Sequence, residues 1–226
     1  MPAEISPARG ALDGRLVLLA YALIVGVVLY AVVSAQRSSA LAPLDGSGRV
    51  TYFIAEGRPE SQYRPQDRAL ATWALRAWER SAGGALRFEP SPEQDALVRL
   101  RWVNAGDGQY GEMRPLYVNG RRGAEVFVRP DTDGLGGEMA RLARTDPLMR
   151  DTIVYLTCVH ELGHALGLNH TDDFRDIMYF FGFGGDIPGF FHRYRAQLNR
   201  REDIAGVSGL SAGDIDRVSA LYGGSR

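Results

Sequence analysis

Three of the four histidines in this 226-residue chain lie within eleven residues of one another, at His160, His164 and His170. On a helix, His160 and His164 would be one turn apart on the same face, so both imidazoles could bind one metal ion. Glu161 would lie about 100° around the helix axis, where its carboxylate could deprotonate a water molecule beside that metal. Gly167 favours a helix end, because glycine readily adopts the left-handed conformation that would bring His170 back to the metal.

These residue types predict metal-assisted hydrolysis. Three neutral imidazoles with a vacant fourth position are typical of catalytic zinc, whereas structural zinc sites are usually closed by four protein ligands, often cysteines. Cys158 is the only cysteine, so cysteines cannot close this site, and we expect Cys158 to be a small core residue. Zinc lowers the pKa of bound water to about 7 and polarises a carbonyl, which makes peptide hydrolysis feasible at neutral pH. The plainer alternative is a helix face whose histidines make ordinary hydrogen bonds, but the added Gly167 and His170 at the required spacing argue against it.

The overall composition is that of a globular protein, and the length fits one domain with an appendage. The formal net charge is −1, and all 26 basic residues are arginines. These arginines are scattered and form no stripe that could follow a nucleic-acid backbone, so no nucleic-acid partner is expected. The lone cysteine excludes an internal disulfide framework, and the sequence does not indicate the oligomeric state.

The most apolar segment is residues 16–35, which carries no charge and is flanked by Arg15 and Arg37. At about 1.5 Å per residue, a helix of this length reaches the roughly 30 Å of a bilayer's hydrocarbon core. We therefore expect four parts: an N-terminal tail (1–15), a single-pass transmembrane helix (16–35), a linker (36–48) and the main domain (49–226). The main domain is expected outside the cytoplasm. Secretion after signal cleavage is the alternative, since small residues at positions 33–35 resemble a cleavage site.

Hydrophobic periodicity places several elements around the histidines. Alternating apolar and polar residues predict strands at residues 50–57, 84–90, 96–103 and 124–130. Apolar residues at helical spacing predict helices at residues 68–80, 146–167 and 211–223. The second helix would begin at Asp146 and Pro147 and end at Gly167. The third would begin at a capping box formed by Ser211 and Asp214. The metal-binding histidines would thus lie at the end of a long helix that follows a sheet.

The string H-E-L-G-H-A-L-G-L-N-H, followed by Met178 in D-I-M-Y, resembles the signature of the metzincin metalloproteases. Among the metzincins, the chain is most similar to the matrixins. Residues 124–131 resemble their strand that ends in aspartate, and residues 170–179 resemble their connection between the third histidine and the methionine turn. Residues 210–223 resemble their C-terminal helix. The resemblance extends over residues 49–223.

This resemblance implies an α+β metzincin catalytic domain with a twisted mixed sheet of about five strands and about three helices. It implies that His160, His164 and His170 bind one catalytic zinc, that Glu161 is the general base, and that Met178 lies in a turn beneath the zinc. It implies a zinc-dependent endopeptidase acting on protein or peptide substrates. Calcium sites are common in the family, and although no complete calcium loop is present, oxygens could come from Asp131, Asp133, Asp172 and Asp173.

Two departures from the family pattern follow the methionine. Phe180 occupies the position where related metzincins have a tyrosine, with Tyr179 one residue early. Residues 179–209 form a longer segment than in matrixins and could shape specificity, act as a flap, rest on lipid headgroups or simply cover the core. The rival to an enzyme is a catalytically silent zinc-binding module at the membrane surface. Glu161 argues against that rival, because a purely structural site needs no general base.

Overall fold

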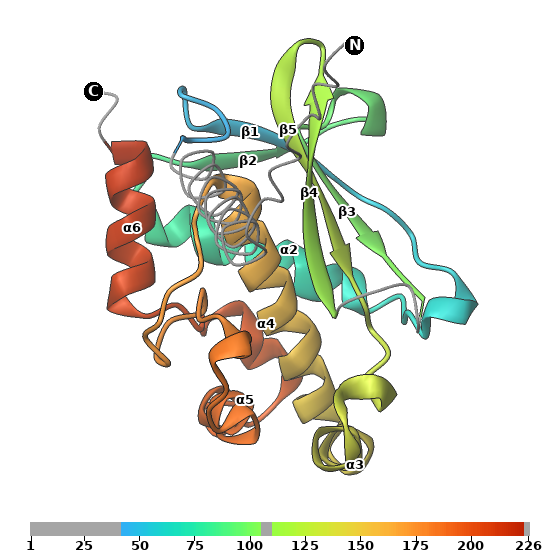
Figure 1. Cartoon of the computed structure of the whole chain (residues 1–226). Helices are drawn as coiled ribbons and strands as arrows, with labels where there is room; N and C mark the ends of the chain where they lie inside the picture. Colours follow the sequence, from blue (N-terminus) through green and yellow to red (C-terminus); the bar gives the residue numbers. More distant parts are fainter. Residues whose placement is uncertain (1–41, 105–109, 224–226) are drawn as a thin grey trace, which may run out of the picture. The chain divides into compact units, whose positions relative to one another are not determined.

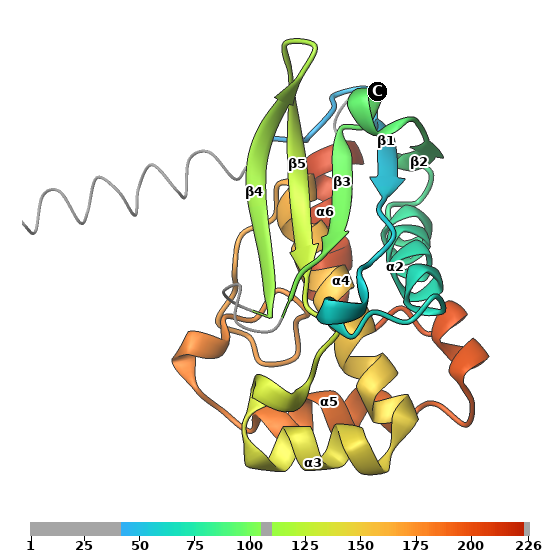
Figure 2. The same ribbon diagram turned by 90° about the vertical axis from the view of Figure 1, so that its right-hand side faces the viewer.

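The protein is described by a computed structural model for residues 42–104 and 110–223, and a five-stranded sheet forms one layer of it (Figure 1). Its strands are β1 (Arg49–Ile54), β2 (Arg87–Pro90), β3 (Val98–Trp102), β4 (Gly111–Val118) and β5 (Arg121–Val128). Their order across the sheet is β2-β1-β3-β5-β4. Every neighbouring pair is parallel except β4 and β5, which form an antiparallel hairpin (Figure 2). The predicted mixed sheet of five strands is confirmed.

Helices on one side of the sheet form the second layer, and the others lie beyond one end of the sheet (Figure 2). In chain order they are α2 (Asp67–Ser81), α3 (Gly137–Thr145), α4 (Pro147–Leu166), α5 (Ile187–Arg195) and α6 (Ala212–Gly223). Short 3₁₀ turns connect them: η1 (Pro59–Ser61), η2 (Glu93–Asp95), η3 (Asp133–Leu135), η4 (Phe181–Phe183) and η5 (Arg201–Ala205). Figure 2 shows α4 and α6 behind the sheet. The core lies between these two layers.

Helix α2 packs along α4 through an apolar face. Leu70, Ala74 and Trp78 recur at intervals of four residues and are fully buried. The Trp78 indole N–H donates a 2.9 Å hydrogen bond to the carbonyl of Val159 on α4. At the other end of α2, Asp67 forms a buried ion pair with Arg150 of α4, with 2.7 Å between Oδ2 and Nη2. Apolar packing and one buried charge pair therefore fix α4 against α2.

Helix α4 carries the histidine motif and has the predicted ends. The Asp146 carboxylate accepts hydrogen bonds from the backbone N–H groups of Leu148 and Met149, at 3.0 and 3.2 Å. Pro147 occupies the first turn, where its missing N–H costs no helical hydrogen bond. Gly167 terminates the helix with φ of 107°, a conformation that side chains with a Cβ rarely adopt. The predicted start and end of this helix are confirmed.

The last described helix, α6, begins with the predicted capping box. The Ser211 hydroxyl accepts from the Asp214 N–H at 3.0 Å, and the Asp214 carboxylate accepts from the Ser211 N–H at 2.9 Å. Two backbone donors that would otherwise lack partners are thus satisfied. Asp214 is completely buried, which a capping residue on a surface helix does not require.

The described residues contain five α-helices, so the expectation of about three helices was too low. Helix α3 was missed because it is short, follows two glycines and buries only a few residues, among them Met139 and Ala143. Helix α5 lies inside the aromatic segment 179–209, where glycines interrupt the helical pattern. Strand β4 was not located, because Pro115 argues against a strand interior. Proline is tolerated there because β4 is the edge of the sheet.

The predicted N-terminal tail (1–15) and transmembrane helix (16–35) lie outside the described residues. Within residues 42–104 and 110–223, no helix has the length and apolar character needed to cross a membrane. The described end of the predicted linker contacts the domain, since Leu44 is buried and its N–H donates a 3.0 Å hydrogen bond to the Tyr222 hydroxyl. A residue of the predicted linker thus packs against the domain, and the four predicted boundaries stay predictions.

Candidate metal centre and active site

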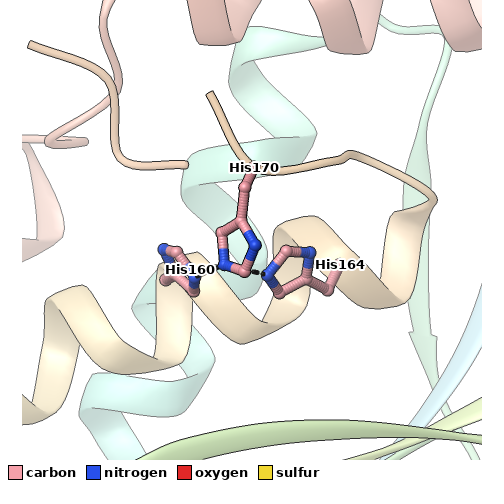
Figure 3. Close-up of side chains that lie close together, drawn as sticks. All are labelled: His160, His164 and His170. Atoms are coloured by element: carbon pink, nitrogen blue, oxygen red, sulfur yellow. Dashed lines mark hydrogen bonds between the residues drawn. The ribbon is translucent and has the colours of Figure 1, made fainter. Parts of the chain in front are cut away.

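The three histidines of the motif converge on one point (Figure 3). His160 and His164 project from α4, and His170 comes from the loop after Gly167. The Nε2 atom of His170 lies 3.2 Å from Nε2 of His160 and 3.1 Å from Nε2 of His164. Of the side chains in the described ranges, only these three histidines form a group of three or more metal-binding residues close enough to share an ion. The predicted ligands are therefore brought together.

The backbone fixes how two of these rings are oriented. Nδ1 of His160 lies 2.6 Å from the carbonyl oxygen of Ile177, and Nδ1 of His164 lies 2.8 Å from that of Leu168. A carbonyl oxygen can only accept, so each Nδ1 carries the hydrogen and donates it. Each Nε2 is left with a lone pair directed at the other rings. Lone pairs at this separation repel one another unless a cation lies between them.

A zinc ion fits this arrangement. Imidazole nitrogens bind zinc at about 2.0–2.1 Å, which places two ligands of a tetrahedral site about 3.4 Å apart. The separations of 3.1 and 3.2 Å between Nε2 atoms are close to that value. Hydrogen bonding of the distal ring nitrogen to a carbonyl is also the usual support for a zinc-binding histidine. The separations of the Nε2 atoms and the hydrogen bonds of His160 and His164 therefore both suit zinc.

The protonation state of the rings suits metal binding. Burial lowers the pKa of His160 to about 3, with further lowering by the neighbouring His164. Burial likewise lowers the pKa of His170 to about 4 and lowers that of His164. All three imidazoles are therefore neutral at pH 7, which is the form that coordinates a metal ion.

Glu161 is buried beside the ligands on α4, with 7% of its surface exposed. Burial raises the pKa of its carboxyl group to about 8, and the charge of Glu112 contributes in the same direction. Gly111, the first residue of β4, makes room for this side chain. A Cβ atom at position 111 would lie 2.8 Å from the carboxylate carbon of Glu161. Gly111 is thus a site residue that the sequence did not reveal.

Met178 packs against α4 between the two histidines of the helix. It is fully buried, and its sulfur and methyl group occupy the space that a Cβ at Gly163 would need. The Trp78 ring also approaches this position, with Cζ2 3.0 Å from where that Cβ would be. Gly163 therefore lets Met178 and Trp78 lie directly against the helix that carries the ligands.

Hydrogen bonds hold the loop that contains Met178. The Thr171 N–H donates to the Met178 carbonyl at 2.8 Å, and the Ile177 N–H donates to the buried Asp214 carboxylate at 2.8 Å. The carbonyl of Ile177 is the one that accepts from His160. Asp214 of α6 is therefore connected to a metal ligand through a single residue. The sequence indicated only the capping role of Asp214.

The two aromatic residues after Met178 point in different directions. Tyr179 is buried, and its hydroxyl donates to the Gly184 carbonyl at 3.0 Å. The Phe180 ring lies beside His170, with 4.8 Å between ring centroids. The ring next to the metal centre is thus a phenylalanine with no hydroxyl to offer, while the tyrosine hydroxyl is engaged elsewhere.

Three of the four carboxylates considered for calcium are partnered by arginines. Asp131 contacts Arg129 at 2.8 Å, and Asp133 contacts Arg144 at 2.6 Å. Asp173 contacts the side chain of the nearby Arg175 at 2.6 Å. The four aspartates Asp131, Asp133, Asp172 and Asp173 are not gathered into one metal-binding group in the part of the chain that the structure describes. Calcium binding at these residues stays a prediction.

Fold and centre together are those of a metzincin domain. The Matrixin family profile matches residues 45–184, and the chain belongs to that family. The family implies a catalytic zinc, and His160, His164 and His170 are placed so that they could bind it. The family and the zinc cofactor predicted from the sequence are thereby confirmed.

The individual relatives share less than a third of their aligned residues with this chain. The chain is 28% identical over 177 residues to macrophage metalloelastase of Oryctolagus cuniculus and 29% identical over 178 residues to interstitial collagenase of Sus scrofa. It spans 32% of the length of each of these relatives. Among solved structures, high choriolytic enzyme 1, a hatching enzyme zinc-protease from Oryzias latipes, matches 79% of this chain and 90% of its own, with 20% identity and a TM-score of 0.40.

Proposed function

We propose that this protein is a zinc-dependent endopeptidase that hydrolyses peptide bonds in proteins or peptides, with Glu161 as the general base. The observation that carries the proposal is the convergence of three neutral imidazoles beside a buried carboxylate, in a chain of the matrixin family. When bound, zinc supplies a Lewis acid that polarises the carbonyl under attack and makes water more acidic.

The residues of the chain contribute orientation and proton transfer. The carbonyls of Ile177 and Leu168 fix His160 and His164 in the tautomer whose Nε2 can bind metal. Glu161 accepts a proton from the attacking water and passes it to the leaving amine. With its pKa raised to about 8, Glu161 holds a proton at neutral pH in the metal-free chain. A nearby cation favours the ionised form, so the base is generated where the metal is bound.

Two substitutions distinguish the enzyme from a silent zinc-binding module. Glu161→Gln keeps the shape and all three imidazoles, so we expect about one zinc ion per chain and a loss of at least about a hundredfold in peptide hydrolysis. His170→Ala removes a ligand, so zinc content and activity should fall together. His192→Ala is the matched control, because His192 is exposed and lies outside the centre.

Zinc content by atomic absorption and cleavage of a broad peptide library are the measurements. Equal cleavage by the parent and the Glu161→Gln variant would exclude Glu161 as the base. A parent that binds zinc and cleaves no peptide would favour the binding module instead.

We also propose that residues 16–35 anchor the protein in a membrane, with the catalytic domain outside the cytoplasm. The support is the uncharged apolar run between Arg15 and Arg37, whose length matches a bilayer. Secretion after cleavage near residue 35 is the alternative. Whether detergent is needed to extract the full-length protein distinguishes membrane anchoring from secretion.

A further inference from the structure

The hydroxyl group of Tyr222, near the end of α6, connects two distant segments of the chain. It donates a 2.9 Å hydrogen bond to the carbonyl of Leu166, the last residue of α4. It also accepts a 3.0 Å hydrogen bond from the N–H of Leu44, which precedes the first strand. All three residues are buried. The hydroxyl therefore uses its donor and an acceptor site at once.

The carbonyl of Leu166 depends on this hydroxyl. The last four carbonyls of an α-helix have no hydrogen-bond donor within the helix. The N–H of Gly167, which ends α4, donates to the His164 carbonyl at 3.0 Å and leaves Leu166 without a donor from that turn. Leu166 is completely buried, so water does not reach its carbonyl. The Tyr222 hydroxyl supplies the missing donor.

The residues directly after Leu166 belong to the metal centre. Gly167 turns the chain, and the Leu168 carbonyl then accepts the 2.8 Å hydrogen bond from Nδ1 of His164. Two residues later comes His170, whose Nε2 lies 3.1 Å from Nε2 of His164. A shift of the Leu166 carbonyl would therefore move both the group that orients His164 and the segment that carries His170.

The segment before β1 encloses the same turn. A Cβ at Gly167 would lie 2.5 Å from the carbonyl oxygen of Ala42, so this close approach needs glycine. The Ala42 carbonyl also accepts a hydrogen bond from the guanidinium of Arg122 on β5. Asp45 forms an ion pair with Arg121 at the start of β5. The sheet therefore holds this segment in place, and with it the N–H that donates to α6.

We propose that Tyr222 is a positioning residue of the metal centre. Its hydroxyl fixes the Leu166 carbonyl, and the turn that begins there places the Leu168 carbonyl and His170. The N–H of Leu44 orients the hydroxyl, so the segment that leads into the domain supports the centre as well. The proposal rests on the zinc site of the function proposed above and adds a residue of the last described helix to it.

The test compares Tyr222→Phe with Tyr194→Phe in the full chain. Each substitution removes the hydroxyl of a buried tyrosine that donates to a backbone carbonyl, which for Tyr194 is that of Val207, at 2.7 Å. Val207 lies outside the turn after α4, so Tyr194→Phe is the matched control. The measurements are the zinc dissociation constant by competition with a chelator, the visible spectrum of the Co²⁺-loaded protein, and thermal unfolding of the metal-free protein.

We expect Tyr222→Phe to weaken zinc binding about tenfold, because residues that hold metal ligands in place typically contribute about ten- to a hundredfold to metal affinity. The cobalt spectrum should change as well, since it depends on how the ligands are arranged around the ion. Tyr194→Phe should lower the unfolding temperature by a similar amount and leave both metal measurements as in the parent.

Unchanged zinc affinity and an unchanged cobalt spectrum in Tyr222→Phe would overturn the positioning role and leave the zinc centre intact. Equal weakening of zinc binding in both variants would overturn it in favour of general stability. A parent chain that binds no zinc would overturn the centre and the proposed function together. If Tyr222→Phe does not fold, Leu44→Pro removes the N–H that donates to the hydroxyl, and Leu44→Ala keeps it. The proline variant alone should then weaken zinc binding, and equal affinities in these two variants would overturn the proposal.

Discussion

Gly111→Ala should separate catalysis from metal binding, because the three atoms nearest to the added methyl group would all belong to Glu161. The new Cβ would lie 2.7 Å from Cγ and 2.8 Å from Cδ of Glu161. Carbon atoms in ordinary contact are about 3.5–4.0 Å apart, so the glutamate or the strand must move by about 1 Å. Only 7% of the surface of Glu161 is exposed, so this side chain cannot move without disturbing its neighbours.

A displacement of about 1 Å in a catalytic group can reduce the rate about a hundredfold, or nearly 3 kcal/mol in activation free energy. We expect Gly111→Ala to lose activity on this scale while it retains one zinc ion per chain. Overpacking should also lower the free energy of unfolding by about 1–3 kcal/mol. Gly137→Ala is the matched control, because a Cβ at position 137 would meet no atom within 4 Å.

A variant that carries both Gly111→Ala and Glu161→Gln tests directly whether the first substitution acts through Glu161. If Gly111→Ala acts through Glu161, adding it to Glu161→Gln should cost little further activity, since residues that act as a unit are not additive. The measurements are kcat/KM on one peptide, zinc content and thermal unfolding for the four proteins of the cycle. Fully additive losses, or a Gly111→Ala protein that has lost its zinc, would refute the reasoning.

Three further predictions concern stability and location. In the zinc-free protein, the pKa of Glu161 is raised from 4.5 to about 8, so the folded state holds a proton that the unfolded state has lost. This contribution to stability, at most roughly 5 kcal/mol, should disappear as pH rises from about 4.5 through 8, and urea unfolding of Glu161→Gln should lack that decline. Arg150→Met leaves the buried Asp67 carboxylate without its partner and should cost about 3–5 kcal/mol in urea unfolding. Arg114→Met, at an exposed ion pair, should change stability little, and equal losses in the two variants would contradict this view. If residues 16–35 span a membrane, detergent should be needed to extract the full-length protein, whereas a chain beginning near residue 40 should be soluble. Recovery of only a soluble form cut near residue 35 would favour secretion.

The metal ligands could be predicted because their arrangement is local. Two residues four apart on a helix always share a face, so His160 and His164 needed no tertiary information. The helix ends were equally local, since Asp146, Pro147 and Gly167 determine them through their own backbone chemistry. Features that depend only on residues close together in the chain can therefore be predicted from a single sequence.

The supporting residues could not be predicted, because their roles depend on contacts between distant segments. Gly111 matters because β4 approaches Glu161, and Gly163 matters because Met178 and Trp78 fill the space above it. The same limit explains the missed strand. Pro115 is compatible with β4 only because nothing pairs with that edge of the described sheet, which the local sequence does not show.

The hydrogen bond from Ile177 to Asp214 has a consequence for the order in which the metal centre is completed during synthesis. Asp214 lies on α6, which leaves the ribosome after all three histidines and after Met178. A nascent chain that has already exposed its ligands still lacks the carboxylate that positions Ile177, and Ile177 is the residue whose carbonyl orients His160. The metal centre is therefore completed only after α6, which is made later than the three histidines, has docked.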